Sequence, residues 1–215
     1  MPNWCSNVIN ISHPDKAKID AIEAAARADS DKGILATVLP CPEELNDNDL
    51  TTWSHGPEQE AREKKKAELK AKYGYESWYD WNIAHWGTKW DLCEPHVERI
   101  DDNTITITCE TAWSPPIAAY ESMQAEGYYV QGFYYEGGMC FAGVWEDGTD
   151  DCYQEWGDSQ GAKATLPQEV DEMFNISESQ AEYEEEERRE EELYRFTVDG
   201  AEKRKELKLV DETDQ

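Results

Sequence analysis

The most regular pattern in the chain is the alternation of apolar and polar residues at positions 104–111. Ile105, Ile107 and Cys109 fall on one side of an extended chain there, and threonines with one glutamate fall on the other. A period of two predicts a strand in a sheet that has one buried face and one polar face. Other short apolar or aromatic stretches, bounded by turn residues, predict strands at 4–11, 34–39, 96–100, 128–135, 139–145 and 151–156.

Helical spacing of apolar residues predicts helices between these strands. A serine three residues before an aspartate, with a proline in the first turn, predicts a helix over 12–27. A short aromatic helix is predicted over 78–86, where Gly87 supplies the C-cap. The segment 113–125 predicts a further helix that begins around two consecutive prolines.

Tryptophan is concentrated in one stretch of the chain. Four of the nine tryptophans lie within residues 78–91. Because each large aromatic side chain can bury about 150–250 Å², we expect part of the core to close around this segment.

A charged helix interrupts the predicted core. Residues 57–73 begin at Pro57, contain favourable pairs of opposite charge at i and i+4, and have few apolar side chains. This pattern predicts a largely solvated helix within an insertion that spans about 43–75.

The C-terminal part of the sequence is strongly acidic. Residues 168–193 contain twelve acidic residues and two arginines. We predict that residues 158–180 pack partly and that residues 181–215 form an extended, mobile or marginally helical tail.

The order of these elements predicts an α+β fold. Its simplest architecture is a split βαβ core, in which an antiparallel sheet carries its helices on one face. We predict one folded domain over residues 1–157 and an acidic C-terminal extension over residues 158–215.

The net charge of the chain indicates which classes of partner it can bind. The 215 residues include 48 acidic and 20 basic side chains, which gives a formal net charge of −28. Such a surface repels phosphate backbones and anionic membranes, so we expect no direct binding to nucleic acid and none to membranes. Two interpretations remain open: the carboxylates keep the protein soluble, or they occupy the nucleic-acid groove of another protein.

The cysteines indicate a reducing compartment. The six cysteines are dispersed and form no CxxC pair, and no apolar segment of signal-peptide type precedes Trp4. No run of about 18 apolar residues is present either. We therefore expect free thiols and a cytoplasmic location.

Four short motifs together resemble one known family. They are Met1-Pro2-Asn3-Trp4-Cys5-Ser6-Asn7, Trp86-Gly87-Thr88-Lys89-Trp90-Asp91, Trp113-Ser114-Pro115-Pro116, and the pair Tyr134-Tyr135-Glu136 with Phe141-Ala142-Gly143. With them, residues 1–157 resemble the YubB-type ferredoxin-like domain family of phage and plasmid proteins. The resemblance implies a ferredoxin-like topology without an iron–sulfur cluster and a gene carried on a mobile element of a bacterium. It supplies no reaction and no catalytic residues.

Candidate chemistry is sparse. Cys93-x-x-His96 has a spacing that zinc sites use, and Cys140 or Cys152 could complete such a site. A cysteine beside a histidine could also form a nucleophilic centre. We expect structural roles for these residues, and therefore no metal, no cofactor and no catalytic site.

The leading hypothesis is a non-enzymatic protein that blocks a host protein. The partner would be a nucleic-acid-handling or defence protein of the host bacterial cell, and the carboxylates would take the place of phosphates as a nucleic-acid mimic in counter-defence. The candidate partner-binding residues are Glu182, Glu184, Glu185, Glu186, Glu187, Glu190, Glu191, Glu192, Glu146, Asp147, Asp150 and Asp151.

Two alternatives use the aromatic residues or the thiol. The first is a module that binds or sequesters a small, nucleotide-like ligand, with Trp81, His85, Trp86, Lys89 and Trp90 as its pocket. A stacking platform of Tyr128, Tyr129, Tyr134, Tyr135 and Trp113 is a variant of this idea. The second alternative is an enzyme centred on Cys93 and His96. Asp80 and Asp91, which flank the tryptophans, are expected to cap helices or bind backbone amides.

Overall fold

The computed structural model describes residues 3–27, 33–52 and 55–213, and the side chains of this range as far as residue 197. The chain forms two units, Met1–Gln154 and Glu155–Gln215. None of the described helices is both long and apolar enough to span a lipid bilayer.

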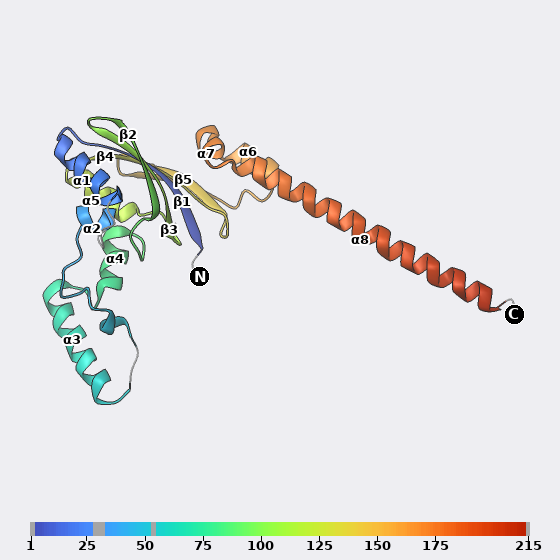
Figure 1. The fold of residues 1–215 in the computed structure, drawn as a ribbon, viewed down its shortest axis with the longest axis horizontal. Coiled ribbons are helices and arrows are strands. Elements are labelled where there is room, and N and C mark those ends of the chain that lie inside the picture. The colour runs from blue at the N-terminus through green and yellow to red at the C-terminus, as the bar shows by residue number, and fades with distance from the viewer. Residues whose placement is uncertain (1–2, 28–32, 53–54, 214–215) are drawn as a thin grey trace. The chain divides into compact units, whose positions relative to one another are not determined.

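A six-stranded sheet is the frame of the first unit (Figure 1). The strand order is β2-β3-β1-β4-β5-β6, and all neighbouring strands are antiparallel. The predicted alternation at 104–111 is confirmed, because Ile105, Ile107 and Cys109 are buried. The strands are β1 (Trp4–Ser12), β2 (Cys93–Asp101), β3 (Thr104–Ala112), β4 (Tyr129–Glu136), β5 (Phe141–Glu146) and β6 (Thr149–Gln154).

Helices cover one face of this sheet and share a hydrophobic core with it. Ile19 and Ile22 of the first helix pack with Ile9 and Ile107 of the central strands. The prediction of an α+β fold with an antiparallel sheet is therefore confirmed. The helices of this unit are α1 (Lys16–Arg27), α2 (Ile34–Val38), the 3-10 turn η1 (Asn48–Thr51), α3 (Pro57–Tyr73), α4 (Trp78–Trp86) and α5 (Ile117–Ala125).

The strand predicted at residues 34–39 is wrong, because this segment forms helix α2. Both edges of β1 are already paired, with β3 and β4, so β1 has no free edge for it. The backbone N–H groups of Leu35 and Ala36 instead donate to the carboxylate of Asp91. A side chain that is distant in sequence thus stabilises the start of a helix whose own residues have the pattern of a strand.

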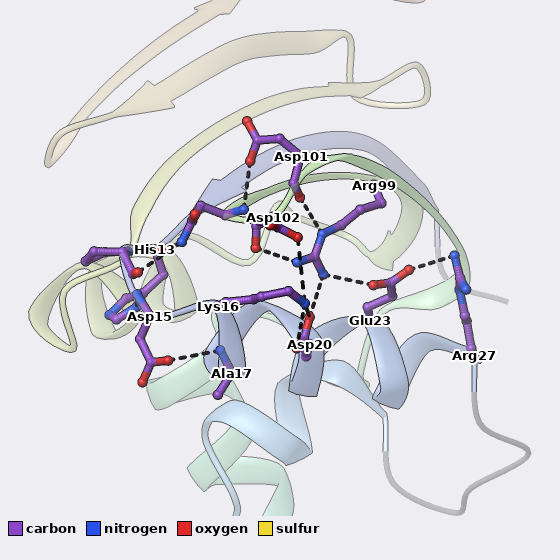
Figure 2. A network of polar contacts seen from close by, with 12 residues as sticks. His13, Asp15, Lys16, Ala17, Asp20, Glu23, Arg27, Arg99, Asp101 and Asp102 are labelled. Atoms are coloured by element: carbon purple, nitrogen blue, oxygen red, sulfur yellow. Dashed lines mark hydrogen bonds and ion pairs between the residues drawn. The ribbon is translucent and has the colours of Figure 1, made fainter.

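The start of α1 also differs from the prediction. Strand β1 continues through Ser12, so this serine does not cap the helix. The carboxylate of Asp15 accepts the N–H of Ala17 at 2.9 Å, and Nδ1 of His13 accepts the N–H of Asp15 (Figure 2). The cap is therefore three residues later than the sequence pattern indicates.

Two helices have the predicted bounds. Helix α3 runs from Pro57 to Tyr73, and α4 is followed by Gly87 in the left-handed conformation, with φ of 81°. Because a residue without Cβ adopts this φ easily, Gly87 ends the helix as expected.

The second unit consists of α6 (Ser159–Thr165), α7 (Gln168–Phe174) and α8 (Ile176–Thr213). Trp156, Ala162, Leu166, Val170 and Ile176 are buried. Where the sequence predicts an extended, mobile or marginally helical tail, the structure has one continuous helix. Its 38 residues correspond to about 57 Å at the usual rise of an α-helix. Glutamate is a good helix former, and ion pairs at i and i+4 add support, such as that of Arg195 with Glu191.

Arg99 binds both α1 and the turn between β2 and β3 (Figure 2). Its guanidinium donates to the carboxylate of Glu23 at 2.8 Å and lies 3.0 Å from that of Asp20. It also donates to the backbone carbonyls of Asp101 and Asp102. The side chain of Arg99 is 19% exposed, so these contacts are partly shielded from water.

Replacing Arg99 should destabilise the first unit. We expect Arg99→Ala to lower the free energy of unfolding by about 1.5–3 kcal/mol, because charge-assisted hydrogen bonds are lost in a half-buried place. Arg27 supplies the control: it binds the same Glu23, but its own side chain is 66% exposed, so Arg27→Ala should change stability by about 0.5 kcal/mol or less. Urea unfolding followed by tryptophan fluorescence measures both values. Equal losses in the two variants would contradict the role given to Arg99.

Candidate functional site

Two loops of the first unit are held together by hydroxyl groups. The hydroxyl of Thr88, which is buried, donates to the carbonyl of Ala112 at 3.2 Å. The hydroxyl of Ser114 donates to the carbonyl of Gly87 at 2.8 Å. The loop after α4 and the loop after β3 therefore form one structure, although about 25 residues separate them in the chain.

Asp91 fixes the first of these loops to α2. One oxygen of its carboxylate accepts the N–H groups of Leu35 and Leu92 at 2.9 and 2.8 Å, and the other accepts that of Ala36 at 2.8 Å. The expectation that Asp91 binds backbone amides is confirmed. A Cβ at Gly33 would lie 2.3 Å from Cγ of Asp91, so the approach of the two segments requires glycine.

Trp90 and Trp113 of the joined loops form a row of tryptophans with Trp4 of β1. The ring centroids of Trp4 and Trp90 are 6.2 Å apart, and those of Trp90 and Trp113 are 6.4 Å apart with nearly parallel planes. Trp4 and Trp113 are 42% and 44% exposed. Nζ of Lys89 lies 4.5 Å from the Trp90 centroid and within 6 Å of Trp113 and Tyr79. Large aromatic residues left in solvent are a usual property of binding surfaces.

The backbone at Trp113 is strained in support of this row. Its φ is 69°, a conformation that costs a residue with a side chain about 1–2 kcal/mol. Its N–H donates to the carbonyl of Asn3, and the hydroxyl of Thr111 donates to the carbonyl of Ser114. These bonds on either side hold the left-handed residue in place and keep its ring beside Trp90.

A surface pocket of about 630 Å³ lies next to Trp4. Trp4, Ser6, Cys93, Glu94 and Glu110 line it. They come from the adjacent strands β1, β3 and β2, and the register places Ser6 opposite Glu110 and Glu110 opposite Cys93. The hydroxyl of Ser6 donates to the Glu110 carboxylate at 2.8 Å. The pocket thus combines one aromatic face with two carboxylates.

The structure separates the residues predicted for a ligand pocket. Lys89 and Trp90, which are half-buried, belong to the tryptophan row, whereas Trp81 and Trp86 lie in the hydrophobic core. His85 stacks on Trp81 with centroids 4.3 Å apart, and burial lowers the pKa of His85.

The sequence reasoning missed Trp4 and Tyr79 as members of this surface. Trp4 and Ser6 are two residues apart on β1, so their side chains point to the same, polar face of the strand. This alternation in the sequence could have predicted that Trp4 lies on the surface.

The four tyrosines of the alternative stacking platform do not form one. Tyr134 is buried, and its hydroxyl donates to Asp150 at 2.6 Å. Tyr128 is also buried and packs on His13, whereas Tyr129 is 48% exposed. Tyr134 and Tyr135 are consecutive on a strand, so their side chains point to opposite faces.

Cys93 and His96 lie on β2 and pair with different residues of β3. Burial, together with the carboxylates of Asp91, Glu94 and Glu110, raises the pKa of the Cys93 thiol. A nucleophilic cysteine needs the opposite shift. In the part of the chain that the structure describes, no three His, Cys, Asp or Glu side chains are grouped so that they could hold a metal ion.

The acidic residues predicted to bind a partner occur at two places. In the hairpin of β5 and β6, Glu146, Asp147 and Asp150 accept hydrogen bonds from Tyr129, Gln124 and Tyr134. Asp151 is exposed on β6. On α8, Glu184 differs from its neighbours, because its carboxylate accepts the N–H and the hydroxyl of Ser159 at 2.7 Å each. The other α8 residues predicted to bind a partner have exposed carboxylates: Glu182, Glu185, Glu186, Glu187, Glu190, Glu191 and Glu192.

Comparisons with known proteins assign no family. No family model matches the chain, and no curated protein matches it. The crystal structure of protein api92 from Yersinia pseudotuberculosis, of family model DUF1281, is similar over 72% of this chain and 98% of that chain. The two share 10% sequence identity with a TM-score of 0.37. A similarity at this level assigns neither a fold family nor a function.

Alkylation of the cysteines tests the nucleophile hypothesis. We expect iodoacetamide at neutral pH to modify Cys93 at least about threefold more slowly than the exposed Cys140 and Cys152, because a raised pKa leaves less thiolate. Mass spectrometry of timed samples measures each rate. Cys5, whose pKa burial raises to about 12, should react only after unfolding and serves as the control. Faster labelling of Cys93 than of Cys140 would favour the Cys–His enzyme instead.

Proposed function

We propose that this chain is a non-enzymatic protein that binds a basic surface of a host protein and blocks it. The observation that supports the proposal is α8, a long helix with carboxylates exposed around much of its circumference. In a bacterial host, nucleic-acid-handling and defence proteins have basic grooves of the kind that such a helix fits. The mechanism would be competitive occlusion, with association that weakens as salt increases.

The exposed residues of α8 suit a protein interface. Seven exposed glutamates lie within residues 182–192, and Tyr194 and Phe196 are 70% and 78% exposed. Interfaces combine such aromatic contacts with a charged rim. An overall charge of −28 adds long-range attraction toward a basic partner.

The proposal includes an origin and a fold family. We infer a gene of a phage or plasmid from the resemblance to the YubB-type family, and a location in the cytoplasm of the host cell. The strand order β2-β3-β1-β4, with α1 and α5 as the helices of the two βαβ halves, supports a ferredoxin-like core. Of the motifs that carry the resemblance, Met1 and Pro2 lie outside the described residues.

Removing exposed carboxylates from α8 should weaken partner binding. We expect Glu182, Glu185, Glu186 and Glu187, all changed to glutamine, to raise the dissociation constant of the host protein by at least about fivefold. Glu184 stays unchanged, because its contacts with Ser159 make it part of the fold. The measurement is capture from nuclease-treated bacterial lysate at low and at high salt, followed by titration of the captured protein.

A matched variant controls for total charge. The same four-charge change on α3, at Glu58, Glu60, Glu63 and Glu68, should leave the dissociation constant within about twofold. If the α8 variant binds as tightly as the parent, or if the α3 variant loses as much affinity, α8 is not the mimic.

A second candidate function is a small-ligand module. The row of Trp4, Trp90 and Trp113 favours it, because exposed rings of this kind stack on nucleotide bases. Lys89 above Trp90 would face the phosphate of such a ligand.

Substitution of Lys89 tests the small-ligand function. If a nucleotide binds to the row, we expect Lys89→Gln to weaken binding of adenosine monophosphate about tenfold, because a charge-assisted contact is lost. Quenching of tryptophan fluorescence measures the affinity, and Lys64→Gln on α3 is the matched control. A parent protein that adenosine monophosphate does not quench would remove this candidate. Trp86→Ala is unsuitable as a test, because Trp86 belongs to the core.

A further inference from the structure

The pocket beside Trp4 has chemistry that neither α8 nor the tryptophan row provides. The exposed Trp4 lines it, and Glu94 and Glu110 of adjacent strands line the same space. One oxygen of the Glu110 carboxylate accepts a hydrogen bond from the Ser6 hydroxyl. This bond orients the carboxylate, and the remaining lone pairs can accept hydrogen bonds from a ligand.

The two carboxylates have no cation beside them. Within the described residues, neither Glu94 nor Glu110 forms an ion pair with a lysine, arginine or histidine. The nearest cation of the row, Lys89, lies over Trp90, Trp113 and Tyr79. The pocket therefore has a negative potential. The pKa of the Cys93 thiol is raised chiefly by burial and further by the charges of Asp91, Glu94 and Glu110.

We propose that this pocket binds an arginine side chain of the protein partner, with the guanidinium stacked on Trp4 and its N–H groups donated to Glu110 and Glu94. The inference rests on the proposed function, because it names the contact that a basic partner would make with the first unit. A guanidinium is planar, always charged and weakly hydrated, so it stacks on aromatic faces and donates to carboxylates at once.

Other ligand chemistries fit less well. Phosphate and other anions would face two carboxylates. A lysine ammonium has the charge but not the plane that stacks on an indole. A metal ion would require a group of ligands that the described residues do not form here.

Nuclear magnetic resonance of the full-length protein tests this site. The probe is the peptide acetyl-Gly-Arg-Gly-amide, and the readout is the indole N–H resonance of Trp4, assigned with Trp4→Phe. We expect a saturable shift with a dissociation constant on the order of 1 mM, as befits one small side chain. The same peptide with citrulline for arginine has the same shape without the charge and should not shift the resonance.

Variants of the carboxylates locate the contact. Glu110→Gln should weaken binding about tenfold through loss of a charge-assisted hydrogen bond. Glu94→Gln should also weaken it and provides a second variant if Glu110→Gln folds poorly. The control is Glu98→Gln, which makes the same charge change on β2 at an exposed position outside the pocket and should stay within about twofold.

Three results would overturn the inference. They are a Trp4 resonance that the arginine peptide does not shift, whether or not adenosine monophosphate shifts it, equal shifts with the arginine and citrulline peptides, or equal losses in Glu98→Gln and Glu110→Gln. The proposed function fails separately, through the α8 variants. If the α8 variants lose the host protein but the arginine peptide does not shift the Trp4 resonance, only the inference about the pocket is refuted. If the pocket binds arginine and α8 has no effect, the pocket stands and the mimic fails.

Discussion

The carboxylate of Asp91 is the contact on which the candidate site depends. It accepts backbone N–H groups from Leu35, Ala36 and Leu92, so it starts α2 and fixes the entry to β2 at the same time. Lys89 and Trp90 immediately precede it in the chain. The positions of Lys89 and Trp90 therefore depend on the hydrogen bonds between Asp91 and the start of α2. A buried or half-buried charge that accepts several amides is a strong and directional constraint, because any displacement leaves several groups unsatisfied.

The second constraint is the division of the tryptophans between core and surface. Trp81 and Trp86 fill the core, and Nε1 of Trp86 donates to the carbonyl of Leu39. Trp90, only four residues later, is half-buried and lies in the tryptophan row beside the exposed Trp113. The left-handed Gly87 lies between the two sets in the chain, because it ends α4 directly after Trp86. The strained backbone of Trp113 shows that the row is held against a local preference, and residues in such conformations cluster at functional sites.

Local signals predicted much of this structure, and contacts between distant residues account for the rest. Three features depend only on residues within one element and could therefore be predicted from the sequence. They are the strand at 104–111, the bounds of α3 and the C-cap at Gly87. Helix α2 depends on Asp91, which is more than fifty residues away, and its residues alone favour a strand. The site shows the same limit. Lys89 and Trp90 were predicted, but Trp4 joins them only through the pairing of β1 with β3, and Glu184 is distinguished from other glutamates of α8 only by its contact with Ser159.

The acidic helix and the pocket would act at different stages of one encounter. Charges on a long exposed helix attract a basic partner over about one Debye length and raise the association rate, but they select little among basic surfaces. A pocket that stacks one guanidinium between an indole and two carboxylates acts only at contact and affects the dissociation rate. A protein with a net charge of −28 has no need of a further charge to attract cations. In the proposed encounter, Trp4, Glu94 and Glu110 would add a defined geometry, and such a geometry distinguishes the binding of one partner from the general attraction of a polyanion to cations.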